Sequence, residues 1–229
     1  AEDIRWSDRP HVGTDVLRDV VKNIRRELVR LGCDVRFNTA MTGLRLESGR
    51  LAAVETESGA IETDSAVLAI GHSARDSFFM LEKLGLELVP KPFSVGVAIE
   101  HRQADIGYAQ YGELYTRLPP ADYRLAEHLE NGRSAYSFCV CPGGVVVASS
   151  SEPDGIVTNG MSYRARDGVN INGALLVSVT PEDFGGPGPL AGVGFQREIE
   201  RAAFALGGSD GRAPAQTVGG FMARRASEH

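Results

Sequence analysis

The apolar positions in the first part of the chain repeat with the period of an α-helix. In TDVLRDVVKNIRRELVRLGCDV, residues 14–35, they recur at spacings of three and four and form one stripe: Leu17, Val20, Val21, Ile24, Leu28 and Leu31. Such a stripe is typical of a helix with one apolar face. Thr14 or Asp15 can cap its start, and Gly32 stands where a left-handed residue commonly ends a helix.

The pattern becomes alternating after this helix. A strand is predicted at 35–38, and TGLRLESGRLAAVETESGAIETDSAVLAIG, residues 42–71, alternates apolar with polar positions. Ser-Gly pairs at 48–49 and 58–59 supply tight turns, so the segment predicts a three-stranded antiparallel meander. The meander runs into AVLAI, residues 66–70, which predicts a buried strand because it is short and wholly apolar. A short helix is predicted at 75–84.

Two prolines, Pro90 and Pro92, mark a change in composition and a predicted domain boundary. Beyond them, residues 103–133 are loop-rich with short helical pieces. The remaining elements expected there are strands at 93–101, 135–141, 145–150, 156–159 and 174–180 and a helix at 190–206. We therefore expect an α+β chain with two domains, residues 1–89 and 90–229.

Charge and cysteine content narrow the class of protein. The chain has 229 residues, a formal net charge of −6 and three cysteines. A negative charge disfavours a general nucleic-acid binder, which needs a basic face. No apolar run reaches the roughly 18 residues of a membrane span, and no secretory signal opens the sequence. An odd number of cysteines favours a reducing compartment. We expect a cytoplasmic protein with neither membrane nor nucleic-acid partners.

The order helix, strand, meander and buried strand ending in LAIG is similar to that of two-dinucleotide-binding-domain flavoproteins after their first nucleotide-binding unit. A glycine at position 71 would let the backbone pass close to a cofactor. Further stretches are RPHVGTDVL, AIGHSARDSF, KPFSVGVAIEH, YSFCVCPGGVVVASS, TNGMSYRARDG and APAQTVGGF. Together they resemble the uncharacterised FAD-dependent dehydrogenases, bacterial flavoproteins loosely related to the HI0933-like flavoproteins.

The resemblance implies an α/β parent protein that binds FAD and is an oxidoreductase of the dehydrogenase type. Its FAD/NAD(P)-binding domain would be interrupted by a substrate domain. Residues 1–89 would then be a partial FAD-binding domain, and residues 90–229 an inserted β-rich substrate domain. The cofactor contacts implied in this chain are Met41, Gly71 and His72. The substrate is unknown, and the sequence offers no identifiable catalytic base.

The sequence departs from this family at the phosphate-binding motif. A G-x-G-x-x-G turn holds the pyrophosphate of a dinucleotide, and none occurs in this chain. The family's closing Gly-Asp segment is missing as well. We therefore expect a middle piece of a longer protein, which by itself binds no FAD and is inactive. The alternative is a non-catalytic β-rich module that binds a ligand or a partner, including a second copy of itself.

Two cysteines, Cys139 and Cys141, stand one residue apart in YSFCVCPGGVVVASS. In a strand their side chains would share one face. A metal site would need two more ligands, and the five histidines are scattered, so no metal is expected. A disulfide between positions i and i+2 of an extended strand would be strained. Core packing of two reduced, mostly buried thiols and a pair facing the flavin both remain open.

Polar residues are dense in TNGMSYRARDG, residues 158–168. The segment suits a binding loop at a strand end, and the candidate substrate contacts are Asn159, Ser162 and Arg164. A solvated loop with an Arg–Asp ion pair is the other interpretation. Arg164 could hold a carboxylate or a phosphate with two hydrogen bonds. Arg9 and His11 precede the first helix, whose N-terminus favours anions.

Overall fold

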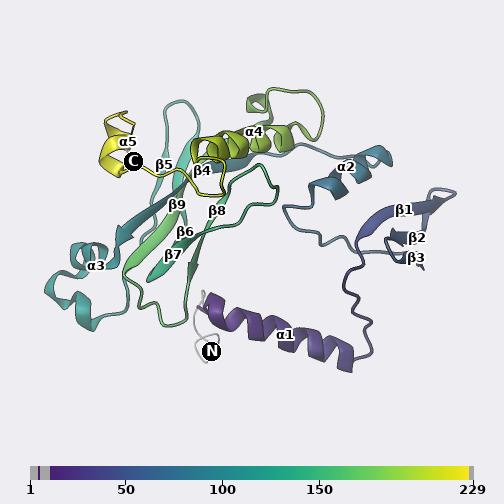
Figure 1. The fold of residues 1–229 in the computed structure, drawn as a ribbon, viewed down its shortest axis with the longest axis horizontal. Coiled ribbons are helices and arrows are strands. Elements are labelled where there is room, and N and C mark those ends of the chain that lie inside the picture. Colours follow the sequence, from purple (N-terminus) through teal and green to yellow (C-terminus); the bar gives the residue numbers. More distant parts are fainter. Residues whose placement is uncertain (1–4, 6–10, 227–229) are drawn as a thin grey trace. The chain divides into compact units, whose positions relative to one another are not determined.

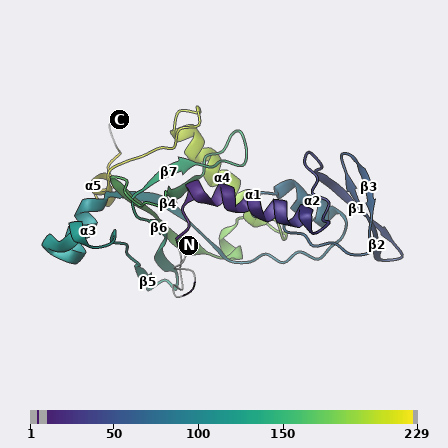
Figure 2. The ribbon, with the colours of Figure 1, turned by 90° about the horizontal axis from the view of Figure 1, so that it is seen from below.

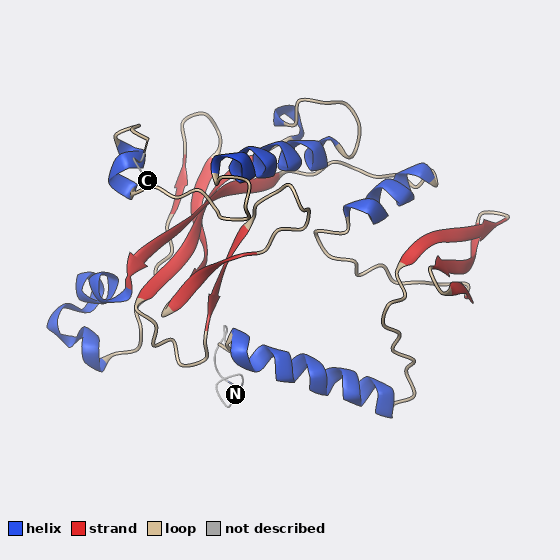
Figure 3. Cartoon of the chain, viewed as in Figure 1, coloured by secondary structure: helices blue, strands red, loops and turns tan. Residues whose placement is uncertain are grey.

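A computed structural model describes Arg5 and residues 11–226 of the chain. Helices alternate with three antiparallel sheets, so the predicted α+β class is confirmed (Figure 1, Figure 3). The chain divides into two compact units. The sheet unit comprises 1–22, 92–183 and 196–229, and the meander unit comprises 23–91 and 184–195. The assignment of residues 1–89 to a cofactor domain and 90–229 to a substrate domain remains a prediction.

The meander unit contains the three strands that the alternating pattern predicted. They are β1 (Met41–Glu47), β2 (Arg50–Thr56) and β3 (Gly59–Glu62), paired antiparallel in the order β1-β2-β3. Ser48 and Gly49 both have positive φ, as a tight turn between twisted strands requires. Ala53, at the centre of β2, is fully buried. The meander therefore forms as the sequence predicts.

Two predicted strands of this unit are wrong. Residues 35–38 form a loop with a bend, and Asn38 has a φ of 52°. Residues 66–70 are extended but belong to no sheet, and the side chain of Val67 is 94% exposed. A strand requires a neighbour for its backbone hydrogen bonds. Within the described residues, neither segment has such a neighbour, so their apolar character does not bury them.

The predicted helices are confirmed. Helix α1 (Thr14–Arg30) ends before Gly32, whose φ is 89°, and α2 (Arg75–Lys83) ends before Gly85, whose φ is 78°. The apolar stripe of α1 forms on the helix, but none of its residues is buried. Among the described residues, no helix combines the length and the apolar character needed to cross a bilayer.

The sheet unit is built on four antiparallel strands in the order β4-β9-β6-β5. Their bounds are β4 (Phe93–Arg102), β5 (Ala126–His128), β6 (Ser134–Cys141) and β9 (Asn170–Val179). Strand β9 pairs with β4 along its whole length, from Phe93↔Val179 to Arg102↔Asn170. Helix α3 (Gln103–Tyr111) and the 3-10 helix η2 (Gly112–Arg117) directly follow β4 (Figure 2). The predicted strands 93–101 and 135–141 are confirmed, whereas β5 was not predicted.

A hairpin of β7 (Gly144–Ala148) and β8 (Thr158–Ser162) lies beside this sheet. Strand β8 begins two residues later than predicted, because the Ile156 N–H donates to the carbonyl of Glu200 in α4 (Ala191–Leu206) rather than to a strand. Arg197 of α4 holds Glu152 with two guanidinium nitrogens, at 2.7–3.0 Å. The hairpin loop is thus fixed to a helix. The short helices η3 (Pro181–Asp183) and α5 (Val218–Met222) complete the described elements.

Candidate functional site

The candidate site lies in the sheet unit where β6 turns into β7. The Pro142-Gly143-Gly144 turn, called here the PGG turn, is held by a side chain of α3. The backbone N–H of Gly143 donates to Oε1 of Gln103 at 3.0 Å, and Nε2 of Gln103 donates to the Ala121 carbonyl at 2.9 Å. Pro142 and Ala121 are both buried. The turn is therefore fixed by a hydrogen bond to the Gln103 side chain as well as by packing.

The PGG turn touches the loop 163–168, which joins β8 to β9, backbone to backbone. Gly143 has a φ of 59°, and a Cβ built on it would come closer than 3.0 Å to the carbonyl group of Arg166. A Cβ on Gly168 would collide in the same way with the carbonyl of Gly143. Only glycine allows this approach. The two glycines therefore place the polar loop directly against the cysteine-containing end of β6.

A buried amide lies beneath this turn. Asn172 of β9 is 0% exposed, and neither its Oδ1 nor its Nδ2 has a hydrogen-bond partner. Its side chain fits because Gly160 and Gly144 leave room: a Cβ on Gly160 would clash with Oδ1, and one on Gly144 with Nδ2. An unsatisfied buried polar group costs about 1–3 kcal/mol. The described residues therefore supply no hydrogen-bond partner for the amide of Asn172, which makes it a polar group to be explained.

The two cysteines adjoin Asn172. Cys141 is the cross-strand partner of Asn172 and is half-buried, whereas Cys139 is exposed. Burial, together with the neighbouring thiol of Cys139, raises the pKa of Cys141 to about 11, against the opposing effect of the Arg166 guanidinium. The prediction that both thiols are mostly buried is wrong for Cys139. The prediction that both side chains follow the alternation of a regular strand is also wrong, because Cys139 has a left-handed φ of 50°.

The N-terminal segment reaches the other side of the loop 163–168. Nε2 of His11 and the carbonyl of Tyr163 are hydrogen-bonded at 2.9 Å, and the Arg164 N–H donates to Oδ1 of Asp15 at 2.9 Å. A Cβ on Gly13 would clash with the Arg164 backbone. The structure thus brings together His11 and Arg164, which the sequence had singled out separately. Arg9 lies outside the described residues.

The other predicted substrate residues lie on β8. Asn159 is exposed and donates from Nδ2 to Oγ of Ser149 at 2.9 Å, whereas Ser162 is 5% exposed. The guanidinium of Arg164 belongs to an exposed residue and is available to an anion. Their role as substrate contacts remains a prediction.

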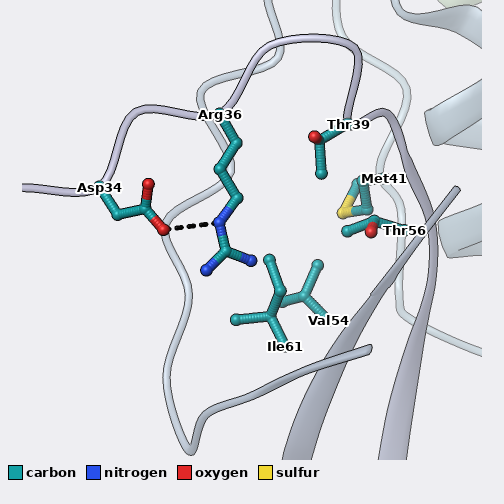
Figure 4. A pocket seen from close by; sticks show the side chains of 7 residues that line it. All are labelled: Asp34, Arg36, Thr39, Met41, Val54, Thr56 and Ile61. Carbon is teal, nitrogen blue, oxygen red and sulfur yellow. Dashed lines mark hydrogen bonds and ion pairs between the residues drawn. The ribbon is translucent and has the colours of Figure 1, made fainter. Parts of the chain in front are cut away.

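The three predicted cofactor residues lie in the meander unit and not at the PGG turn. Met41 lines a pocket of about 340 Å³ (Figure 4), whose other lining residues are Asp34, Arg36, Thr39, Val54, Thr56 and Ile61. Gly71 has a φ of 75°, no heavy atom lies within 4 Å of its would-be Cβ, and His72 is exposed. An open, left-handed glycine fits a backbone that a ligand approaches closely. The role of Met41, Gly71 and His72 as cofactor contacts remains a prediction.

The sequence analysis did not predict three residues of this site: Gln103, Arg166 and Asn172. Arg166 stands in the polar stretch that was noticed, but its left-handed φ of 52° is invisible in the sequence. Asn172 lies two residues before the strand predicted at 174–180, so its place in β9 was not expected. In the described part of the chain, no group of three His, Cys, Asp or Glu residues is arranged to hold a metal ion.

Comparison with known proteins defines the family. Residues 92–229, which contain the PGG turn, the loop 163–168 and both cysteines of β6, match a family model described as "FAD-dependent protein, C-terminal domain-like". This match covers more than half of the chain, so the chain belongs to that family of FAD-dependent proteins. A protein from Clostridium beijerinckii (strain ATCC 51743 / NCIMB 8052), described as "Uncharacterized protein", is 48% identical over 228 residues. The alignment covers 98% of this chain and 43% of that relative, so the chain spans less than half of its length.

Proposed function

We propose that this chain is part of an FAD-dependent oxidoreductase of the dehydrogenase type, and that its site around the PGG turn serves a small-molecule substrate. The observation that carries the proposal is the match of residues 92–229 to the family of FAD-dependent proteins. The length of the Clostridium relative supports a longer parent protein. The missing G-x-G-x-x-G turn supports a parent in which another segment holds the FAD pyrophosphate.

Bound FAD would supply the hydride chemistry, and the protein would supply orientation and electrostatics. In this chain, the open backbone at Gly71 and the pocket at Met41 are the parts that fit the cofactor. In the sheet unit, Arg164 offers an exposed positive charge for an anionic group of a substrate. The buried amide of Asn172 has no hydrogen-bond partner among the described residues, which makes it a candidate polar group of the site.

The experiment compares the chain with a full-length protein. The purified chain and the purified Clostridium relative are each mixed with FAD, desalted and examined by absorbance. We expect the relative to retain about one flavin per protein and the chain to retain none. Losing several charge-assisted hydrogen bonds, each worth about 1.5–3 kcal/mol, weakens binding by several powers of ten.

Two results would contradict the proposal. A relative that retains no flavin would remove the basis for an FAD enzyme. A chain that retains stoichiometric flavin would place the complete binding site within these 229 residues, and the account of a missing phosphate-binding segment would be wrong.

A further inference from the structure

The two cysteines of β6 lie in a β-bulge. Strand β6 pairs with β9 at Phe138↔Ala174 and next at Cys141↔Asn172, so β6 has one residue more than β9 in this interval. Cys139 takes up the extra residue with a φ of 50°. In the described strands it is the one non-glycine residue with positive φ. A left-handed conformation costs a residue other than glycine about 1–2 kcal/mol, so the bulge carries a local cost at Cys139.

The bulge removes the regular-strand geometry around the two cysteines. In an extended strand, the Cα atoms of residues i and i+2 are separated by about 6.6 Å, near the upper limit of about 6.8 Å for a disulfide. A bulge bends the strand and disrupts its regular pairing, so this regular spacing does not hold at Cys139 and Cys141. Sγ of Cys141 donates to the carbonyl of Cys139 at 3.2 Å, so the Cys141 thiol lies against residue 139. The strain expected for a disulfide in a regular strand therefore does not apply.

The two thiols differ in accessibility. Cys139 is exposed and can meet a molecule from solvent, whereas Cys141 is half-buried. The guanidinium of Arg166 is the charged group that acts on Cys141 from the neighbouring loop, and it favours the thiolate. An exposed thiol beside a sheltered one is the arrangement that a two-step thiol–disulfide exchange requires.

We infer that Cys139 and Cys141 form a redox-active dithiol, which exchanges two electrons with small-molecule disulfides through Cys139. The thiolate of Cys139 attacks one sulfur of the small disulfide, whose S–S bond breaks and releases a thiolate. Cys141 then loses its proton to solvent and attacks the sulfur of Cys139. A Cys139–Cys141 bond forms, and the second small thiolate leaves.

The balance of this reaction is complete without another reactant. The protein loses two electrons and two protons, and the small disulfide becomes two thiols. The reaction needs no flavin, so the inference goes beyond the proposed function and can fail independently of it.

The test uses the whole chain with Cys33→Ser, because Cys33 is an exposed free thiol in the meander unit and would obscure the result. The protein is equilibrated in glutathione redox buffers, quenched with acid and alkylated, and its intact mass is measured. In reducing buffer, we expect both sulfurs to be alkylated. In oxidising buffer, we expect a monomer that carries no alkyl group and is lighter by two hydrogen atoms than the reduced chain.

Single variants in this background distinguish the two roles. Cys141→Ser should accumulate a glutathione adduct on Cys139, whereas Cys139→Ser should form an adduct at least about tenfold more slowly, because Cys141 is half-buried with a raised pKa. Circular dichroism checks that each variant is folded. Three results would overturn the inference: both thiols alkylated in fully oxidising buffer, only disulfides between chains, or zinc retained by the pair in the purified chain.

Discussion

Gly143 and Gly132 both have a left-handed backbone conformation, but only Gly143 lies in close contact with another segment of the chain. Both have positive φ, 59° and 80°, but no atom lies within 4 Å of a Cβ on Gly132. A Cβ on Gly143 would meet the backbone of Arg166, which cannot rotate away as a side chain could. The comparison therefore separates the cost of a left-handed residue from the cost of a lost close approach.

We predict that Gly132→Ala lowers the free energy of unfolding by about 1–2 kcal/mol, the cost of a left-handed residue with a side chain. Gly143→Ala should lower it by about 3 kcal/mol or more, because the PGG turn and the loop 163–168 must also separate. Urea unfolding of the chain measures both. Equal losses for the two variants would mean that the contact between the turn and the loop contributes nothing.

The conformations and contacts of single residues were the least predictable feature of the site. The Cys-Val-Cys spacing identified a pair worth attention, but it implied two side chains on one face of a regular strand. The bulge at Cys139 depends on the register between β6 and β9, two strands about 30 residues apart in sequence. The position of Asn172 opposite Cys141 depends on the same pairing. Local patterns carry no information about such a register.

At the scale of elements, Asp183 ties the end of β9 to the turn between β5 and β6. Arg133 donates from Nη2 to Oδ1 of Asp183 at 2.6 Å and from Nη1 to Oδ2 at 2.9 Å. Nη1 of Arg133 also donates to the Ser178 carbonyl, and the Thr180 N–H donates to Oδ2 of Asp183, both at 2.9 Å. The Arg133 guanidinium and the Thr180 N–H hold the pKa of Asp183 far below its usual range.

This lowered pKa sets the direction of a pH effect. Because the carboxyl of Asp183 has a lower pKa in the folded chain than in the unfolded chain, its contribution to stability is fully present above about pH 4. The contribution is lost as the pH falls further towards the folded-state pKa. We predict that Asp183→Asn lowers the midpoint of thermal unfolding at pH 6 and that the difference from the unaltered chain shrinks between about pH 4 and pH 2.

Asp154→Asn is the matched control for this prediction. Asp154 pairs with Arg201 at 2.8 Å, but both side chains are more than half exposed, at 55% and 57%. Such surface pairs contribute little to stability. We expect Asp154→Asn to leave the thermal midpoint nearly unchanged at each pH. A pH-independent loss in Asp183→Asn would show that the carboxylate charge is not what stabilises this connection.

Elements whose stability is local were predicted well. Helices α1 and α4 follow apolar periodicity, and the β1-β2-β3 meander follows alternation with Ser-Gly turns. The predicted strands at 35–38 and 66–70 failed because a strand needs a partner that periodicity cannot supply. Strand β8 begins later than predicted for a related reason. The Ile156 N–H, which was expected to pair with a neighbouring strand, donates to a carbonyl of α4.

At the scale of the whole molecule, the apolar segment 66–70 is a candidate contact with the rest of a longer protein. Its composition, AVLAI, suits burial, yet Val67 is 94% exposed and Leu68 is 41% exposed. The Clostridium relative has more than half of its length outside the aligned region. We predict that this additional polypeptide covers the segment, because an apolar run of this kind gains free energy when it is removed from water.

A lysine at position 67 tests this prediction in two settings. In the chain alone, Val67→Lys should change the free energy of unfolding by less than about 0.5 kcal/mol, since the side chain is exposed. In a chimera, where this chain replaces the aligned part of the Clostridium relative, the same lysine would be buried without a partner. The cost should then be several kcal/mol, seen as a lower thermal midpoint. Ser58→Lys, in an exposed turn of the meander, should be neutral in both settings. If Val67→Lys is neutral in the chimera as well, the segment 66–70 stays in solvent in the longer protein, and its apolar sequence has another cause.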